Sequence, residues 1–274
     1  TRRLALLLLA LGLAITMGVE VVRLQDDIGR MNTVFKFYLQ AWILFGTGTA
    51  FGAASWWQRR ETWTAGWRRL ATTVAVVLFA CVMLYPPLAA RAKVADRFAA
   101  DDQPHTLDGV AYMDRAHFFD GNPDLIPNKQ LPDMNIAADR AAIGWMQKYV
   151  VGSPVILEGN TPNYRWGGRF SIYTGLPSVM GWDWHEKQQR SIVPGAVIDR
   201  RINQVRELYT SPDLARTRYL LDEYQVSLIV VGALERAYYG AVAQSKFDQL
   251  VQTGYLYVGY DKDGVRIYRV VGRS

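Results

Sequence analysis

The chain has 274 residues, of which 50% are hydrophobic, and a formal net charge of +6. This length allows one large domain or two modest ones. The arginines are dispersed along the sequence, so the positive charge does not indicate nucleic-acid binding, and the single cysteine, Cys81, excludes an internal disulfide framework.

The first third of the sequence contains three apolar stretches, over residues 4–22, 34–57 and 70–88. Each is about as long as the roughly 20 residues that cross a hydrocarbon core. We therefore predict a transmembrane region of three α-helices over residues 1–90, with Pro86 and Pro87 ending the third helix. The first apolar stretch starts almost at once, so we expect the chain to be the C-terminal part of a longer polytopic protein.

The charges beside these stretches predict a topology. Arg2 and Arg3 precede the first stretch, and the turn between the second and third carries four arginines against one acid, Glu61. The positive-inside rule places both on the cytoplasmic side. The loop over residues 20–33 and everything after the third helix then face outward. Four tryptophans near this turn fit an interfacial aromatic belt: Trp56, Trp57, Trp63 and Trp67.

The remaining sequence reads as a linker and membrane-proximal segment over residues 91–134, followed by an extracytoplasmic α/β domain over residues 135–274. Apolar periodicity predicts helices and strands in alternation: helices over 136–150, 198–208, 211–224 and 235–252, strands over 154–157 and 227–231, and a hairpin over 255–271. Ser211 is the expected N-cap of the third helix, with Pro212 in its first turn. The pattern predicts a small, mostly parallel sheet with a C-terminal β-hairpin.

Three acids follow the first apolar stretch: Glu20, Asp26 and Asp27. Carboxylates at the outer membrane face could act as the base toward an acceptor hydroxyl, and Asp26 with Asp27 could ligate a divalent cation such as Mg²⁺ or Mn²⁺. The alternative is a solvated loop in which the acids pair with Arg23 and Arg30. Spacing alone leaves both interpretations open.

Polar residues next to this loop are candidates for substrate binding. Arg30 and Lys36 are cations at a depth where they could hold a lipid phosphate, and Asn32 lies between them. Lys36 could equally extend its amine to the interface while its stem stays in the apolar region.

A second candidate region, residues 158–190, is rich in aromatic and polar side chains. It follows a predicted strand, and α/β sheets bind ligands at the carboxyl ends of strands. Aromatic faces beside amides and acids suit a sugar. The alternative is that these groups pack the domain onto the membrane helices, and His185 with its acidic neighbours does not make a zinc site. The candidate ligand-binding residues here are Arg169, Tyr173, Trp182, Asp183, Trp184, His185, Gln189 and Arg190.

Three motifs resemble one known family. They are RMNTVFKFYLQAW at residues 30–42, GRFSIYTGLPSVMGWDWH at 168–185 and VGALERAYY at 231–239. All three, in this order, resemble the DUF2298 membrane proteins, also called the YYY family. The resemblance implies an integral protein of a prokaryotic cell membrane, of which this chain would be the final portion.

The family is distantly similar to the GT-C glycosyltransferases, which take sugars from polyprenyl-phosphate donors and use acids in extracytoplasmic loops. That similarity implies catalytic roles for Glu20, Asp26 and Asp27, with a lipid-linked sugar as the donor. A different class of function is a non-catalytic subunit, which would bind the upstream transmembrane part of the same protein or other membrane subunits. A cavity lined by Asp26 or Asp27 and open to lipid favours the enzyme, whereas the same acids paired with Arg23, Arg30 or another subunit favour the non-catalytic subunit.

Overall fold

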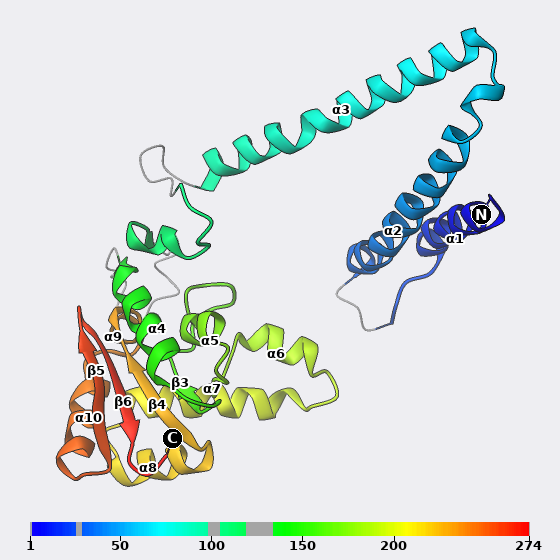
Figure 1. Cartoon of the computed structure of the whole chain (residues 1–274). Coiled ribbons are helices and arrows are strands. Elements are labelled where there is room, and N and C mark those ends of the chain that lie inside the picture. Colours follow the sequence, from blue (N-terminus) through cyan, green and yellow to red (C-terminus); the bar gives the residue numbers. More distant parts are fainter. Residues whose placement is uncertain (1, 26–28, 98–104, 119–133, 274) are drawn as a thin grey trace. The chain divides into compact units, whose positions relative to one another are not determined.

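The computed structural model describes residues 2–25, 29–97, 105–118 and 134–273. The chain divides into two compact units, Thr1–Lys93 and Val94–Ser274, each of which has its own internal packing (Figure 1). We call them the helical unit and the α/β unit.

The helical unit starts with two helices packed against each other, α1 (Arg2–Val21) and α2 (Arg30–Trp57). Small residues allow their close approach. A Cβ added at Gly12 would lie 2.8 Å from the ring of Phe45, and one at Gly48 would lie 3.3 Å from the carbonyl oxygen of Ala5. The two helices therefore meet along a stripe where only small side chains fit.

A short turn, η1 (Arg60–Thr62), leads to the long helix α3 (Ala65–Arg97). Pro86 and Pro87 lie inside α3, so the prediction that they end it is wrong. Proline has a helical φ, and the residues that follow Pro87 are mostly good helix formers, so the helix continues to Arg97.

Among the described residues, α1 and α3 are the helices whose length and apolar composition suffice to cross a membrane. Of the three predicted spans, the first and the third thus meet this criterion, and the second does not. The second stretch does form a helix of 28 residues, α2. Lys36, Gln40 and several Gly and Thr residues reduce its hydropathy.

The α/β unit begins with a 3₁₀ turn, η2 (Ala111–Asp114), and a small antiparallel pair, β1 (His117–Phe118) and β2 (Met134–Asn135). The main fold follows from α4 onward. Its helices are α4 (Ala137–Tyr149), α5 (Arg169–Thr174), α6 (Asp183–Gln189), α7 (Gly195–Thr210), α8 (Leu214–Glu223), α9 (Ala233–Tyr239) and α10 (Val242–Gln252). Its strands are β3 (Val155–Leu157), β4 (Val226–Val231), β5 (Leu256–Lys262) and β6 (Val265–Val270).

The four strands form one sheet in the order β3-β4-β6-β5. The pair β3 and β4 is parallel, whereas β4 with β6 and β6 with β5 are antiparallel. The domain is α/β with a C-terminal hairpin, as predicted, but the sheet is mixed and the expectation of a mostly parallel sheet is wrong. β3, β4 and β5 run in the same direction and are connected through helices, whereas β6 returns directly from β5 through the hairpin and lies antiparallel between β4 and β5.

Helices cover both faces of the sheet (Figure 1). Every residue of β4 is buried, and successive side chains enter opposite layers. Leu228 and Val230 join the cluster that contains residues of α4, whereas Ile229 and Val231 join the cluster that contains residues of α7, α8 and α10. Apart from Ser227, the central strand is therefore apolar, without alternation.

Two helix boundaries differ from the prediction. Asp213, and not Ser211, is the N-cap of α8, because its carboxylate accepts the backbone N–H of Arg216 at 2.9 Å. The segment 235–252 contains parts of two helices, α9 and α10. Gly240 separates them because its φ of 80° leaves the helical region.

The predicted C-terminal hairpin is present, and its turn consists of Asp263 and Gly264. Asp263 and Gly264 both have positive φ, 51° and 77°. This is what a two-residue type I′ turn requires, and Asp-Gly suits it.

Candidate functional site

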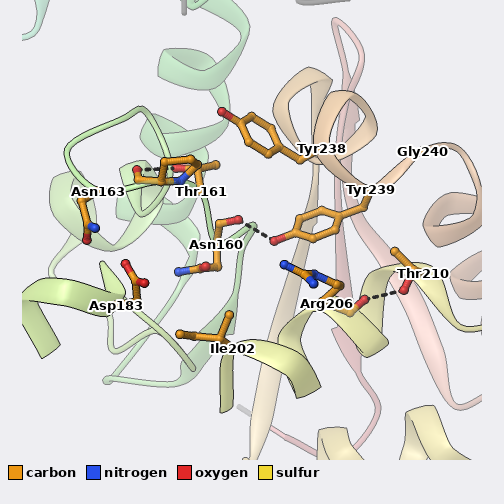
Figure 2. A pocket seen from close by; sticks show the side chains of 11 residues that line it. Asn160, Thr161, Asn163, Asp183, Ile202, Arg206, Thr210, Tyr238, Tyr239 and Gly240 are labelled. Atoms are coloured by element: carbon orange, nitrogen blue, oxygen red, sulfur yellow. Dashed lines mark hydrogen bonds between the residues drawn. The ribbon is translucent and has the colours of Figure 1, made fainter. Parts of the chain in front are cut away.

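A pocket of about 720 Å³ is lined by the loop after β3, the start of α6, helix α7 and the end of α9 (Figure 2). The carboxyl ends of neighbouring parallel strands are the usual ligand position in α/β sheets. We call it the strand-end pocket. Its lining residues are Asn160, Thr161, Pro162, Asn163, Asp183, Ile202, Arg206, Thr210, Tyr238, Tyr239 and Gly240.

The loop after β3 is held in place by hydrogen bonds on both sides. The hydroxyl of Tyr239 donates to the carbonyl oxygen of Asn160 at 2.5 Å, and the Asn160 amide donates to the carbonyl oxygen of Gly181 at 2.8 Å. Asn163 accepts the backbone N–H of Trp184 at 3.1 Å. These bonds tie the loop to α9 and to the start of α6, so the lining is built before any ligand arrives.

Two opposite charges lie in this lining. Arg206 comes from α7 and Asp183 is the first residue of α6, and Figure 2 draws them on different elements around the pocket. Within the described residues, neither the guanidinium of Arg206 nor the carboxylate of Asp183 makes a hydrogen bond or an ion pair. Both groups are therefore available to a ligand.

A buried ion network lies next to the pocket and holds the loop after β3 through Gly159. The Arg169 guanidinium donates to Glu235 at 2.9 Å through Nη1 and again at 2.9 Å through Nη2, and to Asp139 at 2.7 Å through Nε. At most 8% of any of these three side chains is exposed. The indole N–H of Trp166 donates to the same oxygen of Asp139 at 2.8 Å.

Glu235 joins the two strand ends. It accepts the backbone N–H of Gly159 at 3.1 Å and that of Gly232 at 2.8 Å. Burial would raise the pKa of Glu235, but the Arg169 guanidinium and the two backbone bonds lower it below the usual value. The carboxylate is thus a fixed anion that sets the path of both loops.

Glu158 is a third buried acid, and unlike Asp139 and Glu235 it makes no ion pair with Arg169. Its two oxygens accept the backbone N–H groups of Phe170 at 2.9 Å and Ser171 at 3.0 Å, at the start of α5. Burial raises its pKa to about 7, although the charge of Arg169 and these bonds act in the opposite direction. Glu158 therefore titrates near neutral pH.

Tyr209 connects the sheet with the pocket. Its hydroxyl donates to the carbonyl oxygen of Val230 at 2.8 Å, and its ring stacks on Tyr239 with a centroid separation of 4.8 Å. Burial raises the pKa of both phenols, so both are neutral. Tyr239 presents a fixed aromatic wall that a sugar ring could contact.

Of the residues predicted from segment 158–190, Asp183 lines this pocket. Arg169 does not, because it is buried and bonded to two carboxylates; its predicted role in ligand binding is corrected to one of support. Tyr173 is hydrogen-bonded to Tyr112 at 2.5 Å and packs against the cluster on the other face of the sheet.

The other predicted residues of this segment lie on or beside α6. The rings of Trp182 and Tyr164 pack in a tilted arrangement with centroids 5.1 Å apart, and Arg190 pairs with Glu186 at 3.1 Å. None of the following is part of the pocket lining, and four of the five are exposed: Trp182, Trp184, His185, Gln189 and Arg190.

In the helical unit, Glu20 forms an ion pair with Arg30 and also accepts the hydroxyl of Tyr38 at 3.3 Å. An ion pair of this kind is the predicted alternative to a catalytic role for Glu20. Asn32 and Lys36 also have interactions of their own. Asp26 and Asp27 lie outside the described residues. Among the described residues, no group of three His, Cys, Asp or Glu side chains could hold a metal ion.

Sequence reasoning missed most of the strand-end pocket. Arg206 and Ile202 lie on α7, a helix whose apolar face alone had been considered, and Asn163 is one polar residue among many in its loop. A usable signal was present at Tyr238 and Tyr239, which end the third motif and follow the clearest strand. The association of the loop after β3 with α7 and the end of α9 joins residues that are distant in sequence, so local patterns do not predict it.

Comparison with known families recognises the N-terminal part of the chain. Residues 1–45 match the family described as uncharacterized membrane protein (DUF2298). The matched segment contains the motif at residues 30–42, so the resemblance is confirmed there, and the other two motifs lie outside it. The N-terminal segment thus matches a family described as membrane proteins, and α1 and α3 are candidate spans by length and composition.

Comparison with curated proteins found no match. Among solved structures, the C-terminal globular domain of an oligosaccharyltransferase from Archaeoglobus fulgidus is similar, with a TM-score of 0.31 and 8% identity. The similarity covers 48% of this chain and 95% of that domain.

Proposed function

We propose that this DUF2298 chain is the C-terminal part of a GT-C-like membrane glycosyltransferase, and that its α/β unit binds a saccharide in the strand-end pocket. The observation that carries the proposal is that one preformed pocket contains both the carboxylate of Asp183 and the guanidinium of Arg206, neither of which makes an ion pair within the described residues. The polyprenyl-phosphate donor, the extracytoplasmic location and the transfer reaction belong to the same proposal.

The chemistry of the lining suits a saccharide. Sugars present hydroxyl groups at their rims and C–H groups on their faces. Asp183 can accept hydroxyl protons, Arg206 can donate to hydroxyl or carboxylate oxygens, and the ring of Tyr239 offers an apolar surface. The volume of about 720 Å³ lies in the range of small-ligand sites, about 300–1,000 Å³.

The reaction is assigned to the helical unit. A carboxylate from Glu20, Asp26 or Asp27 takes the proton of an acceptor hydroxyl, whose oxygen bonds to C1 of the sugar. The bond between C1 and the phosphate oxygen breaks, and polyprenyl phosphate leaves with both electrons. Arg30, Asn32 and Lys36 are the residues that would hold the donor phosphate.

A divalent cation would fit this loop chemically. The neighbouring carboxylates of Asp26 and Asp27 are the hard oxygen donors that Mg²⁺ and Mn²⁺ prefer. Such an ion would neutralise charge on the leaving phosphate.

Saccharide binding is tested with the full chain in detergent on an array of immobilised glycans. We expect Asp183→Asn and Arg206→Gln each to weaken binding of a captured glycan by about tenfold to a hundredfold, because each removes a charged hydrogen-bond partner. The matched controls, Glu223→Gln and Arg200→Gln, change exposed charges outside the pocket lining and should bind as the wild type does. Equal binding by all four variants, or no binding by the wild type, would contradict a saccharide site.

Transfer is tested separately, by release of polyprenyl phosphate from a polyprenyl-phosphate-linked sugar. We expect the double variant Asp26→Asn, Asp27→Asn to lose release while its far-UV circular dichroism stays unchanged. Glu61→Gln, an exposed carboxylate in the other turn of the helical unit, is the control. Full release both by this double variant and by Glu20→Gln would remove the enzymatic proposal and leave the glycan-binding result intact.

A non-catalytic subunit is the second candidate, and the ion pair of Glu20 with Arg30 favours it. Under this proposal the pair orders the start of α2 so that the helices can dock on other membrane segments. Glu20→Gln would then reduce recovery of co-purifying membrane subunits, and neither this variant nor the wild-type chain would release polyprenyl phosphate. Loss of transfer with unchanged co-purification would argue for the enzyme.

A further inference from the structure

A second pocket, of about 480 Å³, lies in the helical unit between the end of α2 and the start of α3. We call it the arginine pocket. It is built from one continuous stretch of chain, so its geometry belongs to the helical unit alone. It is lined by Trp56, Trp57, Arg60, Trp63, Arg68, Arg69, Thr72 and Thr73.

The pocket concentrates positive charge. Arg68 and Arg69 occupy the first turns of α3, and within the described residues neither guanidinium makes a hydrogen bond or an ion pair. Arg60 lies over the ring of Trp57, 4.7 Å from its centroid, and donates to the Trp57 carbonyl oxygen at 3.1 Å. The described lining contains no carboxylate, and Glu61 contacts Arg60 only at 3.8 Å from the exposed side. The guanidinium groups of Arg68 and Arg69 can therefore bind an anion.

Two further features favour an anion here. The positive end of the macrodipole of α3 lies at its N-terminus, beside Arg68. Thr72 and Thr73 line the pocket and add hydroxyl donors. Together, the guanidinium groups and hydroxyls match the oxygens of a phosphate group.

The surroundings select a lipid phosphate over a soluble one. Trp56 and Trp63 pack together with ring centroids 4.5 Å apart, and such amphipathic rings favour the headgroup level of a bilayer. Directly after Thr73, α3 exposes a long apolar surface that starts with Val74, Val76 and Val77. A phosphate in the pocket would leave its acyl chains against this surface.

We propose that the arginine pocket binds the phosphate headgroup of an anionic phospholipid, on the side of the membrane that the arginines mark as cytoplasmic. The site is independent of the saccharide proposal, because it uses other residues in the other unit. It anchors the turn between α2 and α3 at the membrane surface.

The proposal is tested with the full chain in a non-ionic detergent. Bound lipid is read by native mass spectrometry while short-chain phosphatidylglycerol, phosphatidylcholine or inorganic phosphate is added. We expect retained phosphatidylglycerol and little phosphatidylcholine. Displacement of phosphatidylglycerol by an equal concentration of inorganic phosphate would overturn the lipid assignment.

Variants separate the pocket from general charge. Arg68→Gln with Arg69→Gln should weaken phosphatidylglycerol binding by about tenfold to thirtyfold, since each basic residue near an anionic surface contributes about 1 kcal/mol. The control, Arg2→Gln with Arg3→Gln, removes two exposed charges on the same predicted side and should retain the lipid. Equal loss in both double variants would overturn the pocket.

A conservative variant guards against misfolding. Arg68→Lys with Arg69→Lys keeps both charges but removes the planar, bidentate donors. We expect its affinity for phosphatidylglycerol to fall between those of the wild type and the Gln variant. Wild-type affinity in the Gln variant, with its helix content unchanged, would contradict the proposal.

Discussion

The two units of this chain differ in where their apolar side chains lie: the α/β unit encloses them, whereas the helical unit exposes many of them. In the α/β unit, the apolar residues of β4 are enclosed by helices, and even a guanidinium, that of Arg169, is buried because two carboxylates surround it. In the helical unit, the described part of α3 has no buried residue and exposes most of its apolar side chains. The α/β unit thus completes its own core, whereas the helical unit requires a bilayer or other helices to cover it.

We expect the largest effect on stability from removing the buried cation of the α/β unit. Arg169→Met should leave Asp139 and Glu235 as unpaired buried charges and lower the free energy of unfolding by about 3–5 kcal/mol. The measurement is chemical denaturation of the full chain in detergent, followed by near-UV circular dichroism. Arg200→Met, an exposed arginine, should change stability by less than about 0.5 kcal/mol. Similar stability of both variants would mean that the ion network does not hold the strand ends.

The helical unit is challenged at its small-residue stripe. Gly12→Ala should destabilise the packing of α1 on α2 by about 1–3 kcal/mol, because the new methyl group would lie 2.8 Å from the Phe45 ring. Gly46→Ala is the matched control, since nothing lies within 4 Å of its added Cβ. Unfolding in mixed detergent micelles measures both. A Gly12→Ala variant as stable as Gly46→Ala would show that the two helices do not pack closely.

The smallest effect concerns the pH dependence of the α/β unit. The pKa of Glu158 is raised from 4.5 to about 7, so the folded state holds a proton that the unfolded state releases. Stability from this group is complete below about pH 4.5 and is lost as the pH rises to about 7. The slope should be on the order of 1 kcal/mol per pH unit, and Glu158→Gln should flatten it. An unchanged slope in the variant would show that another group titrates.

The parts of the fold that could be predicted are those set by neighbours in sequence. The run of β-branched residues in β4, the apolar spacing of α7 and the Asp263-Gly264 turn each carry their own local preference. The break at Gly240 was also visible as a glycine, but a glycine ends a helix only where the chain must turn. Conversely, α3 continues through Pro86 and Pro87, although proline usually ends a helix.

The candidate site was less predictable, because the same residue type can be ligand or support. Arg169 and Arg206 are both arginines near aromatic residues in sequence, yet one is enclosed by acids and the other reaches a pocket. Asp183 is among the predicted residues because it stands in a polar segment after a strand, and it lines the pocket. Tyr239 could be found only as part of a motif, since its stacking on Tyr209 joins residues that are distant in sequence.

By itself, the sequence determined that this protein has apolar helices followed by an α/β domain, because hydrophobic periodicity and turn residues act within a few residues of one another. It also determined the arginine-rich turn, which is a single continuous stretch. The tertiary structure decided that the sheet is mixed, that Arg169 supports and Arg206 is presented, and that Glu20 pairs with Arg30. These outcomes depend on which distant groups come within hydrogen-bonding distance, and burial then decides whether a charge is neutralised or left for a ligand.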